Sequence, residues 1–232
     1  MTNEHKEKIF KLNFLDSKKV LLYTITGFIA IVLLQVIGYF TFLNNIPNFL
    51  ENFGWWILYL DISIATIGGA LWYYASYKGY VSCMASMMIG MTLGMQTGMM
   101  IGAVYGAVNG YFIGAMIGMI LGTIIGLVTG RASIMGAMQG AMSGLMGGTM
   151  GAMITMMMFT DHVLYFMPFY MIINVGILAG FVYMYHDEVI KDNKEVVKKK
   201  ISLVSFTLWC VLATIILTAI LVYAPKSLLF GG

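Results

Sequence analysis

Charged residues are scarce in this chain and are confined to a few segments. Only 10% of its 232 residues are charged, 60% are hydrophobic, and the mean hydropathy is +0.87. This composition is too apolar for a water-soluble domain and is typical of a protein that lies mostly in a lipid bilayer. The formal net charge is only +3, and we expect no nucleic-acid partner.

Cysteine, proline and enzyme motifs are also scarce. The chain has three prolines and two cysteines, Cys83 and Cys210, which fall on different predicted helices, so no disulfide framework is indicated. It contains no P-loop, HExxH or CxxC motif, and Ala141 replaces the first glycine of a GxSG signature around Ser143. Residues 201–224 lack the lysine that a retinal protein needs. We therefore expect no enzymatic activity.

Glycine, in contrast, recurs with strict regularity in the middle of the chain. The first row is Gly90, Gly94, Gly98, Gly102, Gly106, Gly110, Gly114, Gly118, Gly122, Gly126 and Gly130, and a second row is Gly136, Gly140, Gly144 and Gly148. In water each such glycine costs a helix about 0.8–1 kcal/mol relative to alanine. In a bilayer, small residues at this spacing let helix backbones touch. The pattern predicts a glycine zipper of several membrane helices.

Apolar runs and polar breaks predict an all-α integral membrane protein with seven transmembrane helices. The expected spans are about 20–43, 54–77, 82–107, 111–130, 133–158, 163–185 and 201–224, after an interfacial segment 1–19 and before a short tail 225–232. The glycine row from 82 to 130 would be about twice as long as the hydrocarbon thickness. Its only polar break is Asn109-Gly110, so we predict a helical hairpin there and a glycine-zipper core of the third, fourth and fifth helices.

The basic residues predict the orientation of these spans. With the N-terminus inside the cell, the cytoplasmic segments are 1–19, 78–80, Arg131 and 186–200, and they contain twelve of the thirteen lysines and arginines. This distribution follows the positive-inside rule and favours an N-in, C-out protein of the plasma membrane.

Methionine is concentrated in one part of the chain. Apart from the initiator, all 21 methionines lie between Met84 and Met184, and the first, second and seventh predicted helices have none. Many are four residues apart, as in Met87, Met91, Met95 and Met99, and again in Met138, Met142, Met146 and Met150. In the third helix Met91, Met95 and Met99 each come one residue after a glycine, which is about 100° around the helix axis. In the fifth helix each of these methionines comes two residues after a glycine, which is about 200°. The thioethers should therefore face either a central pathway or lipid.

Two interpretations of these methionines are open. Methionine is flexible and apolar, so it is a good filler for gaps left by glycine. Thioethers also bind soft Cu(I) or Ag(I) and carry no charge, and a row of weak sites suits ion passage. The candidate metal ligands are Met84, Met87, Met88, Met91, Met95, Met99, Met138, Met142, Met146 and Met150, with Met156, Met157, Met158, Asp161 and His162 at an outer mouth and Cys83 at an inner one.

The MxxxM steps from Met84 to Met88, from Met87 to Met91 and from Met91 to Met95, together with the GxxxG steps, resemble the transmembrane motifs of Ctr-type copper transporters. The resemblance covers local motifs in the third to fifth helices. It implies that MxxxM methionines line a pore and that GxxxG tightens helix packing. The leading hypothesis is a transporter or channel for Cu(I) or Ag(I). The metal is then a substrate rather than a permanently bound cofactor, and a cytoplasmic metal chaperone is a candidate partner.

Two other functions are open. The glycine zipper also suits a structural or interaction subunit of a membrane complex or homo-oligomer that transports nothing. Asp61, a carboxylate within the second predicted span, instead suits a channel for another cation, although a snorkelling or hydrogen-bonded carboxylate near the interface is an equal interpretation. The direction of the methionine rows discriminates between these functions. A shared interior favours conduction, and an outward face favours a scaffold.

Overall fold

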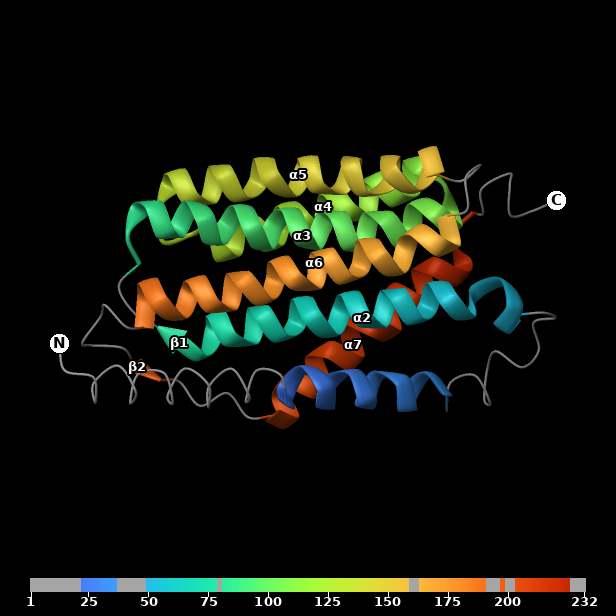
Figure 1. Cartoon of the computed structure of the whole chain (residues 1–232), viewed down its shortest axis with the longest axis horizontal. Helices are drawn as coiled ribbons and strands as arrows, with labels where there is room; N and C mark the ends of the chain where they lie inside the picture. Colours follow the sequence, from blue (N-terminus) through green and yellow to red (C-terminus); the bar gives the residue numbers. More distant parts are fainter. Residues whose placement is uncertain are drawn as a thin grey trace.

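A computed structural model describes residues 22–36, 49–78, 81–158, 163–190, 197–198 and 203–225, and nearly all of these are helical (Figure 1). The helices are Leu22–Val36, α2 (Phe49–Ser76), α3 (Cys83–Asn109), α4 (Tyr111–Thr129), α5 (Ile134–Met157), α6 (Val163–Tyr185) and α7 (Leu203–Tyr223). A short π-helix, η3 (His186–Ile190), and two two-residue strands, β1 (Tyr77–Lys78) and β2 (Val197–Lys198), complete the described elements. The prediction of an all-α architecture is confirmed at this level.

Five helices are long and apolar enough to cross a membrane. They are Gly54–Ser76, Cys83–Asn109, Tyr111–Thr129, Val163–Val189 and Val204–Tyr223. The chain is therefore a multi-pass membrane protein by the length and composition of its helices. Leu22–Val36 is shorter, and the rest of the first predicted span, at 20–21 and 37–43, lies outside the described residues. The glycines of α5 lower its hydropathy, and α5 is not among the five.

The glycine backbones of α3, α4 and α5 contact one another directly. A methyl group added at Gly98 would lie 2.6 Å from the amide nitrogen of Gly148, and one added at Gly118 would lie 3.0 Å from the Cα of Gly102. At Gly126 the added methyl group would overlap the carbonyl group of Gly140. Because only hydrogen atoms separate the three backbones along these rows, no space for a solute remains among the glycines.

The connections of this three-helix unit follow from local residue choice. Gly110 has a φ of 89°, which disfavours residues with a Cβ, and it links the end of α3 to the start of α4. The side chain of Ser82 accepts a hydrogen bond from the amide of Ala85 at the start of α3, and Ser133 does the same for Gly136 at the start of α5. The chain therefore crosses the unit three times with short turns.

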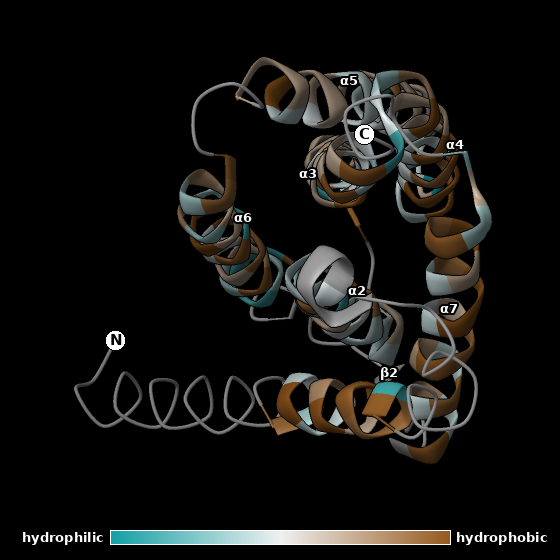
Figure 2. Ribbon diagram, turned by 90° about the vertical axis from the view of Figure 1, so that its right-hand side faces the viewer, coloured by the Kyte–Doolittle hydropathy of each residue, from teal (hydrophilic) through white to brown (hydrophobic). Residues whose placement is uncertain are grey.

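Helices α2, α6 and α7 pack against α3 on the side away from α5, and Leu22–Val36 lies beyond them, against α2 and α7. Viewed along the helices, α2 lies beside α3, with α6 on one flank and α7 on the other (Figure 2). The Tyr105 hydroxyl of α3 donates a 2.6 Å hydrogen bond to the carbonyl oxygen of Leu217 on α7. The core between these helices is apolar and contains the buried rings of Tyr73 and Tyr185.

Three segments with basic residues meet at one end of the bundle (Figure 1, left). Strands β1 and β2 pair in antiparallel register, with Tyr77 opposite Lys198. The Tyr74 hydroxyl of α2 donates a 2.9 Å hydrogen bond to the carbonyl oxygen of Thr129, which precedes the turn at Arg131. The segments around residues 78, 131 and 198 therefore lie at the same end.

Candidate functional site

The methionines of α3 and α5 form one continuous exposed surface. We call it the methionine surface and define it by the members whose exposed fraction lies between 44% and 70%: Met84, Met88 and Met91 of α3, and Met135, Met138, Met142, Met146, Met150, Met153 and Met157 of α5. These residues extend over the whole length of α5. On α5 the surface lies opposite the glycines because the methionines follow them by about half a helical turn.

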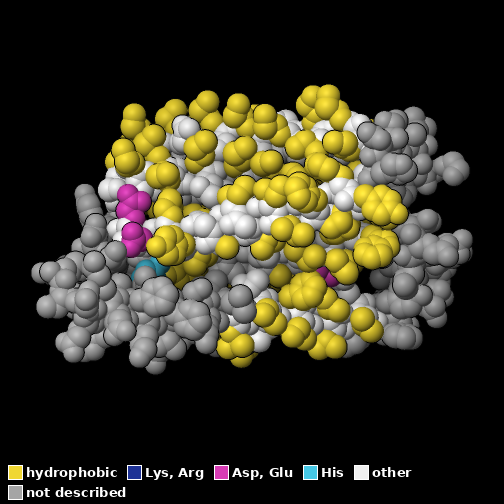
Figure 3. All heavy atoms as spheres, viewed as in Figure 1, with side chains coloured by type: hydrophobic (Ala, Val, Ile, Leu, Met, Phe, Trp, Pro, Cys, Tyr) yellow, Lys and Arg dark blue, Asp and Glu magenta, His cyan; other side chains and the backbone are white. Residues whose placement is uncertain are grey.

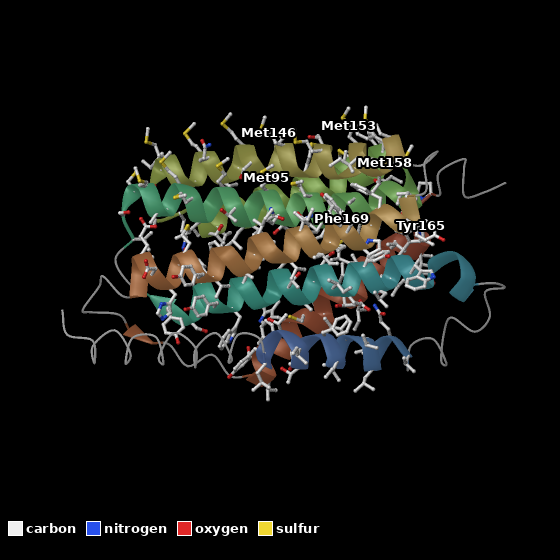
Figure 4. The ribbon with its side chains drawn as sticks, in the orientation of Figure 1. Met95, Met146, Met153, Met158, Tyr165 and Phe169 are labelled. Atoms are coloured by element: carbon white, nitrogen blue, oxygen red, sulfur yellow. The ribbon has the colours of Figure 1, made fainter. Side chains whose placement is uncertain are left out.

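The sequence leaves two directions open for these thioethers, and in the single chain those of the methionine surface point outward. Met146 and Met153 project from α5 away from the other helices (Figure 4), and their exposed fractions are 55% and 46%. The physical reason is the glycine packing, since three helices in backbone contact leave no cavity for a long side chain. The thioethers consequently lie on the perimeter of the three-helix unit.

The rows of α3 and α5 are neighbours on this perimeter. The Gln139 amide nitrogen of α5 lies 3.9 Å from the Met91 sulfur of α3. A methyl group at Gly147 would overlap the Met95 carbonyl oxygen, and a methyl group at Gly151 would overlap the Met99 carbonyl oxygen. The other predicted ligands of this region are half-buried, namely Met87, Met95, Met99, Met156 and Met158. The structure thus brings both rows to one surface.

On other outward faces of the protein, branched aliphatic and aromatic side chains predominate. The face seen in Figure 3 is largely hydrophobic, and most of its acidic groups lie at the end of the bundle where η3 is. On α7 the exposed large apolar residues include Leu208, Leu212, Ile215 and Ile216, and that helix has no methionine. On α6 they include Ile172, Ile173 and Ile177. Contact with lipid explains these residues, but it does not explain why thioethers are concentrated on α3 and α5.

The predicted metal ligands with oxygen, nitrogen or thiol donors do not extend this surface. Cys83 is exposed at the start of α3, next to Met84, whereas Asp161 and His162 lie outside the described residues. Among the described residues, no three His, Cys, Asp or Glu side chains come together as a metal site. Any metal held here would therefore have to be a soft ion bound by thioethers.

Asp61 occupies a separate site on α2. Its side chain is only 1% exposed, and the Gln35 amide donates a 2.5 Å hydrogen bond to its Oδ1 atom. A buried carboxylate with this hydrogen bond does not fit the snorkelling interpretation. The bond joins α2 to the helix Leu22–Val36.

Other polar side chains play roles that the sequence did not predict. The Asn174 amide donates a hydrogen bond to the Tyr170 carbonyl oxygen of its own helix. Asn109 bridges helices, since its amide nitrogen lies 3.3 Å from the Leu221 carbonyl oxygen of α7. The Tyr185 hydroxyl likewise donates to the Tyr77 carbonyl. In the sequence, the tyrosines within apolar spans could have indicated hydrogen bonds of this kind, because a buried hydroxyl usually needs an acceptor.

Comparisons of the chain with protein-family models, with curated proteins and with solved structures found no match. No family assignment follows. Inferences about function therefore rest on the chain's own residues and their arrangement.

Proposed function

We propose that the chain is a multi-pass protein of the plasma membrane, with its N-terminus in the cytoplasm and seven spans built around a glycine zipper, and that it forms a homo-oligomer through the methionine surface. The observation that carries the proposal is the outward direction of the thioethers along all of α5. An outward face is what the scaffold hypothesis requires. A pore inside one chain would instead need these side chains to converge.

A second copy of the chain suits this surface better than lipid does. Gln139 is a half-buried amide among the methionines, and its one described side-chain contact is the weak one with the Met91 sulfur. An amide that faces acyl chains lacks hydrogen-bond partners, whereas an amide at a helix interface can bond to its counterpart.

The lack of charge on α3 and α5 and the flexibility of methionine also favour a second copy of the chain on the methionine surface. Helices α3 and α5 contain no Asp, Glu, Lys or Arg, so two copies related by a two-fold axis meet without like-charge repulsion. Methionine side chains adapt their shape and can interdigitate with an identical surface. Helix association in lipid depends on such close packing, because lipid tails are as apolar as the side chains.

Cysteine cross-linking in native membranes tests the proposal. In a Cys83→Ser background, Met142→Cys places a thiol on the methionine surface, and Ile216→Cys places a matched thiol on α7, where the exposed fractions of the native side chains are 63% and 51%. We expect a short bifunctional maleimide to produce a covalent dimer with Met142→Cys and not with Ile216→Cys. A dimer formed equally by both variants, or by neither, would contradict the proposal.

A second candidate function is passage of Cu(I) or Ag(I) between the copies. It is favoured by the adjacency of the α3 and α5 rows, because two such surfaces face to face would bring thioethers from four helices together. Soft monovalent ions prefer these ligands, and the absence of charge keeps each site weak enough to release the ion. The ion path would lie at the interface between two copies, and each copy would supply half of its thioether lining.

Ag(I) flux into proteoliposomes tests this second function. The variant carries leucine at 138, 142, 146 and 150, and a control carries leucine at Met116 and Met119 of α4, outside the methionine surface. We expect the first variant to lose most of the flux and the control to keep it. Equal flux in both removes the metal function. If Met142→Cys forms the covalent dimer but the unaltered chain carries no Ag(I) flux, the scaffold function stands alone.

A further inference from the structure

A second feature of the fold lies away from the methionine surface. A cavity of about 470 Å³ lies between α2, α3, α4 and α7, and α5 contributes no residue to it. Its walls are almost wholly apolar and include Ile64 and Leu71 of α2, Ile101 of α3, Leu121 of α4 and Leu217 of α7. The volume falls within the range of small-ligand sites, and the lining excludes a polar or charged ligand from most of the space.

The cavity opens sideways toward the surroundings of the bundle. Helices α4 and α7 both line it, yet they are not among the closely packed helix pairs. Trp209 of α7 also lines it and is 68% exposed. In a membrane protein, this opening faces acyl chains, so the molecules that can enter directly are membrane lipids.

The shape of the cavity matches one lipid chain. On α2 its lining extends from Ile64 to Ala75, and on α7 from Ser205 to Leu217. At 1.5 Å per residue, these stretches are about 16 and 18 Å long. One leaflet of the hydrocarbon core is about 15 Å thick. The cavity therefore covers the depth that a single acyl chain covers.

Few polar groups line this slot, and the hydroxyl of one of them, Thr97, is already bonded to the Leu93 carbonyl oxygen. Trp72 lines the cavity, and its indole nitrogen is buried without a hydrogen-bond acceptor among the described residues. Ser205 lines the same end. Two residues beyond Ala75, the backbone of Tyr77 pairs with that of Lys198, which belongs to a lysine-rich segment. Basic residues at the end of a membrane helix attract anionic headgroups.

We propose that this cavity binds one acyl chain of an anionic phospholipid, with the headgroup at the Trp72 and Ser205 end. The lysine-rich segment that contains β2 supplies the positive charge that selects an anionic headgroup. The inference does not depend on the methionine surface or on self-association, because none of its residues belongs to α5.

Photo-cross-linking of the full chain in nanodiscs tests the inference. The probes are phosphatidylglycerol and phosphatidylcholine, each with the same diazirine-bearing acyl chain, and labelled peptides are mapped by mass spectrometry. We expect phosphatidylglycerol to label residues 64–75 and 205–217 several-fold more than phosphatidylcholine does. Labelling spread evenly over the outward faces of α6 and α7 would overturn the proposal, and equal labelling by both lipids would overturn the assignment of an anionic headgroup.

Two variants sharpen the test. Ala213→Phe fills the slot, and Ala179→Phe makes the same change on the exposed face of α6. A phenyl ring displaces at least two methylenes, so we expect labelling to fall about tenfold with the first and not with the second. Unchanged labelling with Ala213→Phe would overturn the site. Lys198→Gln removes a positive charge from the lysine-rich segment, so it should lower the preference for phosphatidylglycerol even if the filled variant fails to fold.

Discussion

At the scale of single residues, the glycines of the three-helix unit differ sharply from glycines elsewhere. The Cβ position of Gly98 is 2.6 Å from the amide nitrogen of Gly148, whereas nothing lies within 4 Å of the Cβ position of Gly180 on α6. Both are helical, so intrinsic helix propensity favours alanine at each by about 0.8–1 kcal/mol. Packing alone separates them, because the backbone of α5 cannot move aside as a flexible side chain would.

The first prediction follows from this contrast. Gly98→Ala should lower the free energy of unfolding by about 1–3 kcal/mol through overpacking, and Gly180→Ala should leave it unchanged or raise it slightly. Thermal or denaturant unfolding of the purified chain in one detergent measures both variants. A Gly98→Ala variant as stable as Gly180→Ala would show that the helices are not in backbone contact.

The second prediction concerns Gln139, the amide within the methionine surface. If it bonds to its counterpart in a second copy, Gln139→Leu should weaken the dimer about threefold, which corresponds to about 0.6 kcal/mol for an interhelical hydrogen bond in a membrane. Energy transfer between labelled chains in liposomes of decreasing protein content measures the change. Gln35→Leu is the control, because Gln35 bonds to Asp61 on a different face of the protein. Unchanged association by Gln139→Leu would indicate that lipid, not a partner, covers this position.

At the scale of elements, much of the arrangement could be predicted from local residue chemistry. The break at Asn109-Gly110 separates α3 from α4, and Ser133 begins α5, because these residues are a turn former and a helix cap. The direction of the methionines was harder to predict. The sequence predicts the three-helix unit and the angle of the methionines relative to the glycines, but it does not reveal whether another helix covers the side of α5 opposite its glycines. In the structure that side is exposed, and the thioethers of α5 lie outside.

The contact between Asn109 and the end of α7 was not predicted. Asn109 looked like a loop residue, yet its amide nitrogen reaches three carbonyl oxygens at the end of α7, those of Leu221, Ala224 and Pro225, at 3.2–3.3 Å. The last carbonyls of a helix lack partners within it, so a buried donor from another helix satisfies them. Nothing in the periodicity of α3 or α7 indicates this pairing, because it joins residues more than 100 positions apart.

The third prediction tests this connection. Asn109→Ala should cost about 1–3 kcal/mol, because the carbonyl groups at the end of α7 lose a buried partner. Hydrogen exchange should become faster at the C-terminal turn of α7 and remain unchanged at Ser133 and the start of α5, where the serine cap is intact. Equal protection of α7 in both proteins would mean that the amide does not hold the helix end.

At the scale of the whole molecule, the two ends of the bundle differ in charge. Segments around Lys78, Arg131 and Lys198 lie at one end, brought there by the β1–β2 pairing and by the Tyr74 hydrogen bond to Thr129. The sequence assigned these segments to one side of the membrane from their basic residues alone. A fold that had placed one of them at the other end would have been incompatible with that assignment.

The last prediction concerns which side of the membrane each end faces. Cys83 is exposed at the start of α3, at the end with the basic segments, and Phe112 is 75% exposed at the start of α4, at the opposite end. If the basic end is cytoplasmic, a membrane-impermeant maleimide should label Phe112→Cys in intact cells, in a Cys83→Ser background. The native Cys83 should react only after permeabilisation. Labelling of Cys83 in intact cells would show that the protein has the opposite orientation. The polar end of the lipid cavity would then lie in the outer leaflet, because Trp72 and Ser205 lie at the same end as Cys83.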